Sequence, residues 1–323
     1  MDRAIISNNL VILQDGSKVF CLENNRTFEN LPPIHSISAG SGCLFLDFDG
    51  QVWGMGSNLN SELGTIGVGI KQPKKLKGLP KIVKINSSPM NFSYFIDDKG
   101  KAWSCGYNGY GQTGQGNMHR SEEPCPVIGD ALPKMISIAT STHHALLLGE
   151  DGTVWSCGEN NNGQMGRNVE PVFHRYSTVG ATHKKVDIST PIQAIAAGSG
   201  YSLFLDFEGN VFATHYAERF IQVKNLPRII GIAACDSLAV GIDEDHKLWR
   251  ISTYREAYMI DGVENVVAVS FSRNNILALD AEGGLWSGVE TASIIEFERK
   301  EVPGAVLLPK KVTTKSARNA APK

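Results

Sequence analysis

A short motif recurs along this chain of 323 residues, and it constrains the fold more than any other feature. Each copy places an acidic residue and, in six of the seven, a Gly just before an apolar-aromatic pair, as in "EDGTVW" at residues 150–155. There are seven copies, and all five tryptophans of the chain occupy the aromatic position. The aromatic positions are Phe20, Trp53, Trp103, Trp155, Phe212, Trp249 and Trp286. Such self-similarity predicts one supersecondary unit repeated seven times.

Each copy predicts a β-hairpin. Short apolar runs lie on both sides of the turn, and Gly supplies the positive φ that a tight hairpin turn requires. The turn glycines are Gly16, Gly50, Gly100, Gly152, Gly209 and Gly283. In the sixth copy His246 takes the place of the Gly, which predicts a looser turn there. We expect the aromatic after each turn to pack between neighbouring repeats.

A further apolar run precedes each hairpin, and an outer strand such as "PKKLKG" (73–78) or "CPVIG" (125–129) follows it. Four short strands per unit, repeated seven times without helical periodicity, predict an all-β, seven-bladed β-propeller of four-stranded antiparallel blades. We assign residues 1–308 to the propeller. Residues 309–323 carry five positive charges and no acid, and we expect them to form a disordered basic tail.

Bulk properties exclude several classes of function. The net charge of −2 gives no overall attraction to nucleic acid, and only the basic tail offers a weak contact. No apolar run is long enough to span a membrane, and the N-terminus does not read as a signal peptide. The six cysteines form no C-x-x-C pair and are expected to be reduced thiols. We therefore expect an intracellular, monomeric protein, cytoplasmic or nuclear, without a membrane partner.

Three copies continue into a more specific pattern, W-x-x-G-x-N-x-x-G-Q-x-G. The second and third of them match at Gly106, Asn108, Gly111, Gln112 and Gly114, and at Gly158, Asn160, Gly163, Gln164 and Gly166. The first departs, with Ser61 and Glu62 in place of Gly-Gln. The pattern resembles the repeat of the regulator of chromosome condensation family. That resemblance implies a seven-bladed propeller, gives His144 a structural role, and raises the possibility of guanine-nucleotide exchange on a small GTPase.

Catalytic and metal-binding motifs are missing from the sequence. There is no P-loop, no G-x-S-x-G elbow and no H-E-x-x-H motif. The pair His143-His144 lacks further ligands nearby, and the acidic turns lack EF-hand spacing. We expect no cofactor, no metal and no catalytic residue, and hence no enzyme apart from the exchange activity.

Variable loops are the predicted site of function. The longest interval between aromatics holds aromatic and cationic residues typical of interface anchors. Other candidates lie in the loops that join the first two strands of each unit. The predicted partner-binding residues are Phe173, His174, Arg175, Tyr176, Met90, Phe92, His143, Asp236 and Arg273.

The leading hypothesis is a non-catalytic protein-interaction scaffold that presents these loops on a rigid ring. The alternative is a guanine-nucleotide exchange factor for a Ras-superfamily small GTPase. In that case residues 168–187 are the candidate segment that would contact the phosphate-binding region of the GTPase and displace its nucleotide.

Overall fold

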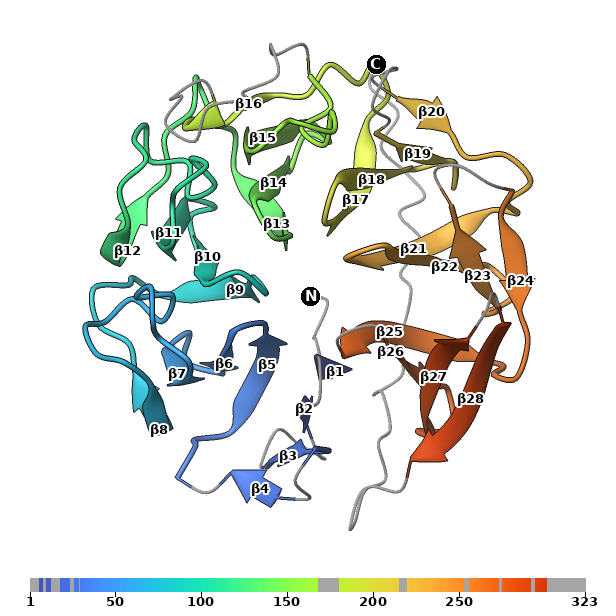
Figure 1. The fold of residues 1–323 in the computed structure, drawn as a ribbon, viewed down its shortest axis with the longest axis horizontal. Helices are drawn as coiled ribbons and strands as arrows, with labels where there is room; N and C mark the ends of the chain where they lie inside the picture. The colour runs from blue at the N-terminus through green and yellow to red at the C-terminus, as the bar shows by residue number, and fades with distance from the viewer. Residues whose placement is uncertain are drawn as a thin grey trace, which may run out of the picture.

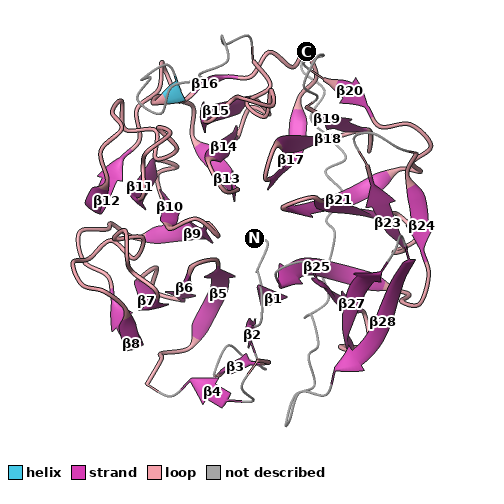
Figure 2. Cartoon of the chain, viewed as in Figure 1, coloured by secondary structure: helices cyan, strands magenta, loops and turns pink. Residues whose placement is uncertain are grey.

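The computed structural model describes residues 6–7, 10–12, 18–23, 26–28, 30–167, 180–214, 220–252, 256–272, 275–291 and 294–300. Their strands form seven four-stranded antiparallel sheets, arranged as blades around a central axis (Figures 1 and 2). The seven-bladed propeller predicted from the sequence is therefore confirmed. The last three blades are complete, although their connecting loops are shorter.

The blades follow one another in chain order. Blade 1 contains β1 (Ile6–Ser7), β2 (Leu10–Ile12), β3 (Val19–Cys21) and β4 (Arg26–Phe28). Blade 2 contains β5 (Ile34–Ala39), β6 (Gly42–Asp47), β7 (Val52–Gly56) and β8 (Ile70–Lys75). Blade 3 contains β9 (Ile82–Ser87), β10 (Phe92–Asp97), β11 (Ala102–Gly106) and β12 (Ser121–Pro126). Blade 4 contains β13 (Met135–Thr140), β14 (His144–Gly149), β15 (Val154–Gly158) and β16 (Lys184–Lys185).

The second half of the ring has the same organisation. Blade 5 contains β17 (Ile192–Gly198), β18 (Tyr201–Asp206), β19 (Val211–Ala213) and β20 (Ile221–Gln222). Blade 6 contains β21 (Ile229–Cys235), β22 (Leu238–Asp243), β23 (Leu248–Ile251) and β24 (Tyr258–Ile260). Blade 7 contains β25 (Val266–Ser272), β26 (Asn275–Asp280), β27 (Leu285–Thr291) and β28 (Ile294–Lys300). The first strand of each blade lies nearest the axis (Figure 1).

The turn between the second and third strands is a glycine hairpin in five blades. Gly50, Gly100, Gly152, Gly209 and Gly283 have φ values of 82°, 81°, 77°, 91° and 85°. Gly16 lies outside the described residues.

The prediction of a looser turn at His246 was wrong. His246 itself adopts φ 61°, and its N–H donates to the Asp243 carbonyl at 3.0 Å, as Gly50 does to Asp47 at 3.2 Å. The carboxylate of Asp243 holds this turn closed by accepting the N–H groups of Asp245 and Lys247.

Apolar side chains fill the seams between blades. The aromatic on the third strand packs against a cluster that includes the preceding blade, as Trp53 does with Leu10 and Val19 of blade 1. Trp155 is 8% exposed and packs with Tyr94 of blade 3. The same placement holds for Trp103, Phe212, Trp249 and Trp286. The predicted role of the aromatics between blades is confirmed at these six positions.

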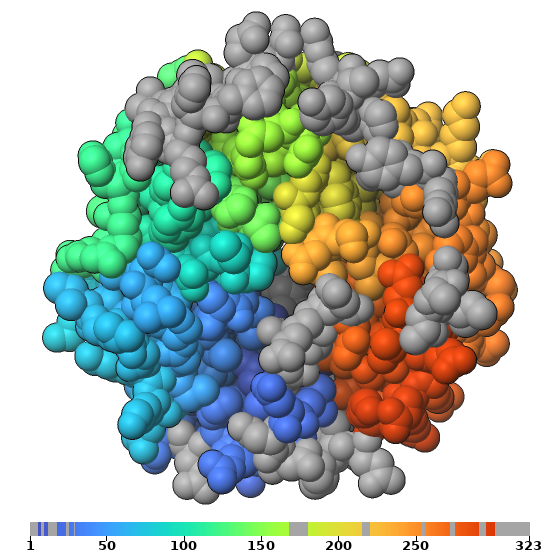
Figure 3. Space-filling view, viewed as in Figure 1, coloured from blue at the N-terminus to red at the C-terminus, as the bar shows by residue number. Residues whose placement is uncertain are grey.

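The ring closes by contact between blade 7 and blade 1. Ile6 and Val11 of blade 1 pack with Leu277, Leu279 and Leu285 of blade 7. Among the described residues, blade 1 contains only the first four strands and blade 7 only the last four, so no strand is shared across the closing seam. Figure 3 shows the coloured blades meeting side by side around the axis, with blue beside red at this seam. Closure of the described ring therefore depends on apolar packing.

Candidate functional site

One face of the propeller carries the candidate functional residues. Because the strands of each blade are antiparallel, the loops joining strands one to two and three to four emerge on the same face. The glycine hairpins emerge on the opposite face. Of the predicted residues, Met90, His143 and Asp236 lie in loops of the first face, which we call the loop face. Met90 is 37% exposed.

Two groups of predictions have other outcomes. Phe92 is fully buried among Tyr94, Ala145 and Trp155 in the seam between blades 3 and 4. Its assignment to a partner surface was wrong, because it opens strand β10 and its side chain turns into the core. Phe173, His174, Arg175, Tyr176 and Arg273 lie outside the described residues, as do residues 309–323 of the predicted tail.

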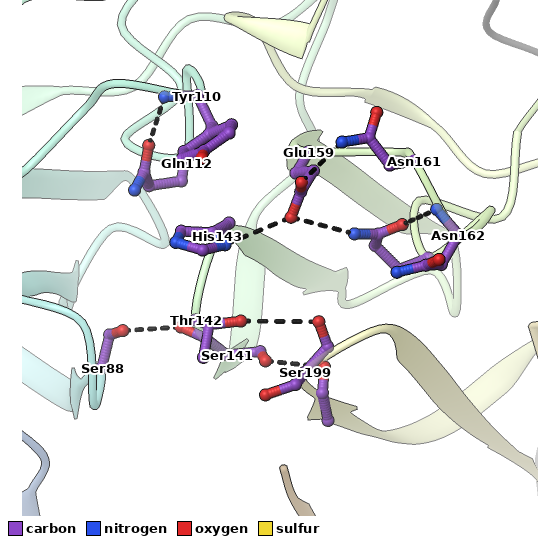
Figure 4. Close-up of polar contacts among 12 residues, drawn as sticks. Ser88, Tyr110, Gln112, Ser141, Thr142, His143, Glu159, Asn161, Asn162 and Ser199 are labelled. Carbon is purple, nitrogen blue, oxygen red and sulfur yellow. Dashed lines mark hydrogen bonds and ion pairs between the residues drawn. The ribbon is translucent and has the colours of Figure 1, made fainter. Parts of the chain in front are cut away.

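A chain of hydrogen bonds ties the inner loops of this face together. Ser88 Oγ donates to the Ser141 carbonyl at 2.6 Å, and Ser141 Oγ donates to the Gly198 carbonyl at 2.6 Å. Ser199 continues the chain, with its Oγ 2.8 Å from Asp236 Oδ1. These contacts join blades 3, 4, 5 and 6, and Figure 4 shows the part around Ser141. The loops are therefore positioned by their neighbours, which reduces the entropy lost when a partner binds.

The loops that carry the Asn-x-x-Gly-Gln pattern, residues 108–112 and 160–164, are also stabilised by internal hydrogen bonds. Asn108 Oδ1 accepts the Thr113 N–H at 3.0 Å, and Gln112 Oε1 accepts the Tyr110 N–H at 2.9 Å. Asn160 and Gln164 make the same bonds one blade later. These polar side chains therefore shape the loops from the inside.

The departure at Glu62 is explained by the same geometry. Its Oε2 accepts the Asn60 N–H at 2.9 Å, as the amide oxygen of Gln does in the other loops. A carboxylate is as good an acceptor as an amide for this bond.

A cluster of Tyr110, His143 and Glu159 spans the loops of blades 3 and 4. The rings of Tyr110 and His143 lie 4.3 Å apart at 38°, and His143 Nδ1 is 3.2 Å from Glu159 Oε2. Tyr107 adds an edge contact to Tyr110 at 6.5 Å. The hydrogen bond from His143 lowers the pKa of Glu159, against the opposing effect of burial. Figure 4 shows His143 between Tyr110 and Glu159.

The three side chains of the cluster and the neighbouring Tyr107 are half-buried. They combine aromatic area with a polar rim, which is the composition of an interface anchor. The sequence analysis identified His143 and missed the other three, although Tyr107, Tyr110 and Glu159 lie within the repeat motif itself.

The neighbouring His144 has a different role. It is fully buried, and its Nε2 lies 2.9 Å from Ser202 Oγ of blade 5. Ser202 Oγ donates onward to the Gln164 carbonyl at 2.7 Å, so its oxygen accepts the Nε2–H of His144. Burial lowers the pKa of His144 to about 4. A neutral histidine that joins two blades agrees with the structural role implied by the family resemblance.

A buried thiol and imidazole lie together beneath the loops. Cys157 Sγ is 3.3 Å from His183 Nε2, and Tyr94 Oη is 3.0 Å from the same nitrogen. Burial raises the pKa of Cys157 to about 12 and lowers the pKa of His183 to about 3. Both groups are fully buried, so this pair acts in packing rather than as a nucleophile and base. In the described ranges, no group of three or more His, Cys, Asp or Glu side chains could hold a metal ion.

The inner strands surround a central channel. A cavity of about 790 Å³ lies between them, lined by small and apolar residues such as Ala139, Ala196 and Val269 and by hydroxyl groups such as Thr140. No helix in the part of the chain that the structure describes is long and apolar enough to cross a bilayer.

Comparison with known proteins supports the sequence motif and the fold. Models of the regulator of chromosome condensation (RCC1) repeat match residues 99–148, 151–205 and 135–164. A 127-residue stretch is 32% identical to "Protein RCC2 homolog" of Danio rerio, covering 38% of this chain and 23% of that protein. A 176-residue stretch is 31% identical to human "E3 ubiquitin-protein ligase HERC2", covering 53% of this chain and 4% of that protein. The chain thus matches about a quarter of the RCC2 homologue's length and far less of HERC2.

Solved structures show the same architecture. Human WBSCR16 superposes with a TM-score of 0.72 at 17% identity, covering 86% of this chain and 85% of that one. Prp20p from Saccharomyces cerevisiae gives a TM-score of 0.71 at 16% identity, covering 84% of this chain and 78% of that one. The chain is therefore a seven-bladed β-propeller, and within it residues 99–205 match models of the regulator of chromosome condensation repeat.

Proposed function

We propose that this chain is a non-catalytic scaffold that binds a partner protein on its loop face. The observation that carries the proposal is the half-buried Tyr110–His143–Glu159 cluster, which is held between two blades by side-chain contacts. Aromatic rings fixed at such a position can enter a partner interface at little cost in conformational entropy. The predicted anchors Phe173 to Tyr176 belong to the segment of chain between β15 and β16 and lie outside the described residues.

The chemistry of the described residues is consistent with binding rather than catalysis. The Cys157–His183 pair is buried, and its pKa values are shifted away from reactivity. We place the protein inside the cell, in the cytoplasm or nucleus, on the basis of its cysteine usage, and expect it to be a monomer.

Affinity capture from a cell lysate with quantitative mass spectrometry tests the proposal. Tyr110→Ala should remove the specific partner, because it deletes the ring that contacts His143. His143→Ala should weaken capture with little loss of stability. Phe207→Ala is the matched control, since Phe207 is 60% exposed at a hairpin tip on the opposite face. Equal capture by wild type and Tyr110→Ala, or equal loss with Phe207→Ala, would contradict the assignment of the loop face.

Guanine-nucleotide exchange remains the alternative. Prp20p was characterised together with its binding to Gsp1p and histones, but at 16% identity the likeness to this chain establishes the fold alone. Release of a fluorescent guanine nucleotide from a panel of small GTPases distinguishes the two functions. Acceleration that depends on residues 168–187 would favour exchange, and no acceleration would favour the scaffold.

A further inference from the structure

A second hollow opens on the loop face, away from the Tyr110 cluster. Its volume is about 950 Å³, and its lining comes from the β17–β18 loop of blade 5, the β21–β22 loop and the last two strands of blade 6, Asn162 of blade 4 and Glu290 of blade 7. The residues that matter for its chemistry are Tyr201, Asp236, Arg250, Glu256, Tyr258 and Glu290. Blades 5 and 6 lack the Asn-Gly-Gln motif of blades 3 and 4, and their connections between the third and fourth strands are shorter.

The one cationic side chain among these lining residues is already engaged. Arg250 donates from Nη1 to the Ala239 carbonyl at 3.3 Å and from Nη2 to the Ser237 carbonyl at 3.2 Å. Its Nε lies 3.5 Å from Glu290 Oε1, and its side chain is 14% exposed. The guanidinium therefore belongs to the wall of the hollow, where its donors are taken up by protein acceptors.

The carboxylates of the hollow outnumber this cation. Asp236 and Glu256 are exposed, and Glu290 is one-third exposed. Asp236 Oδ1 accepts a bond from Ser199 Oγ, which fixes the carboxylate at the rim and leaves Oδ2 for a ligand. Three carboxylates around one neutralised arginine give the described lining an excess of negative charge.

Two tyrosines add a second recognition element. Tyr258 is 39% exposed at the hollow, and Tyr201 is held by a hydrogen bond from its Oη to the Cys235 carbonyl at 3.3 Å. Burial raises the pKa of Tyr201, so the ring stays neutral. Aromatic faces beside carboxylates favour ammonium and guanidinium groups, through cation–π contact and charge-assisted hydrogen bonds.

We propose that this hollow binds a Lys- or Arg-containing extended segment of a partner protein. The volume accommodates several side chains, and the charge and aromatic lining are complementary to cationic ones. The site is separate from the Tyr110–His143–Glu159 cluster and does not depend on the function proposed for that cluster.

Fluorescence anisotropy on the full-length chain tests this site. The probe is a fluorescein-labelled octapeptide, Gly-Lys-Ser-Arg-Gly-Lys-Ser-Gly, and the comparison peptide has Glu in place of each Lys and Arg. We expect saturable binding of the cationic peptide alone, weakened as salt is raised. Asp236→Asn combined with Glu256→Gln should weaken binding about tenfold. Tyr258→Ala should also weaken binding, whereas Tyr258→Phe should retain it.

Charge-matched variants make the outcome specific. Glu123→Gln combined with Glu244→Gln removes the same charge from exposed positions elsewhere and should leave the affinity within about twofold. Tyr110→Ala should bind the peptide as wild type does, which separates failure of this site from failure of the proposed scaffold function. Equal weakening by both double variants would overturn the proposal, because binding would then reflect net charge.

The chain's own basic segment, residues 309–323, is the competing occupant. Carbodiimide cross-linking followed by mass spectrometry detects it as a bond between Lys310 or Lys311 and Glu256. Such cross-links together with no peptide binding would overturn the assignment to a partner protein. Absence of both peptide binding and cross-links would overturn the site itself.

Discussion

The indole Nε1–H of Trp53 donates a hydrogen bond of 3.0 Å to Oδ2 of Asp47, six residues earlier in the chain. Oδ1 of the same carboxylate accepts the N–H groups of Asp49 and Gln51 inside the hairpin turn. One aspartate thus closes the turn and orients the ring that packs against the preceding blade. The Asp–Trp bond recurs in three further blades, at Trp103, Trp249 and Trp286.

Removing this aspartate should destabilise the propeller more than its place in a surface turn suggests. Asp97 is 4% exposed, and Asp97→Ala leaves the N–H groups of Lys99 and Lys101 and the Trp103 indole without their acceptor. We expect a loss of about 2–3 kcal/mol in the free energy of unfolding, measured by urea denaturation. Asp98→Ala is the control, because Asp98 is the exposed next residue. A loss below about 0.5 kcal/mol for Asp97→Ala would contradict this role.

The aromatic side chain on the third strand makes a separate contribution to the stability of the fold. Trp155 is nearly buried between blades 3 and 4, and in its copy the indole donates to Thr153 Oγ1 at 3.0 Å because Gly149 replaces the aspartate. Trp155→Ala should cost about 3–5 kcal/mol, as for other buried aromatics. Trp155→Phe keeps most of the packing and should cost about 1 kcal/mol through the lost hydrogen bond. A stable Trp155→Ala variant in thermal unfolding would argue against the seam role.

Acid should weaken the fold through His144. Its folded pKa of about 4 is below the value of about 6.5 in an unfolded chain, so the unfolded state binds a proton first. The stability that neutral His144 contributes to the fold is fully present above pH 6.5. It is lost as pH falls toward 4, at roughly 1 kcal/mol per pH unit. His144→Gln should be less stable at pH 7.5 but should lose less stability between pH 7.5 and 5 than wild type.

Urea denaturation at several pH values measures this slope. The exposed His119 provides the control, since His119→Gln should leave the slope of wild type unchanged. A wild-type slope in His144→Gln would show that other groups cause the acid sensitivity.

The sixth hairpin offers a test of backbone strain. His246 has φ 61°, a conformation that costs roughly 1 kcal/mol for a residue with a Cβ. Both His246→Gly and His246→Ala lose the contact of its Nδ1 with the Val266 carbonyl, so comparing them isolates the backbone. The Gly variant should be more stable than the Ala variant by about 1 kcal/mol in urea. Equal stability would mean that the turn relaxes to another conformation.

Local chemistry made the fold predictable from the sequence. The positive φ at the glycines, the alternation of apolar runs and the repeated aromatic are properties of single hairpins, and each copy carries them. Asp47 and its equivalents were visible in the sequence too, six residues before the aromatic. Their role was missed because the bond to the indole depends on the conformation of the turn between them.

Adjacent residues show where the sequence stopped being informative. His143 and His144 are neighbours in the chain, yet His143 contacts Tyr110 and Glu159 on the loop face while His144 is buried against Ser202 of the next blade. Met90 is partly exposed, and Phe92, two residues later, is fully buried. The acidic hollow likewise takes its lining from four successive blades, with residues that range from Asn162 to Glu290.

The sequence alone determined the number of blades and the hairpins, because these depend on contacts within about fifty residues that every repeat encodes again. Tertiary structure decided which side chains face a partner and which fill a seam. The exposure of a loop side chain depends on the neighbouring blade. Nothing in the local sequence shows which residues of that blade will cover it.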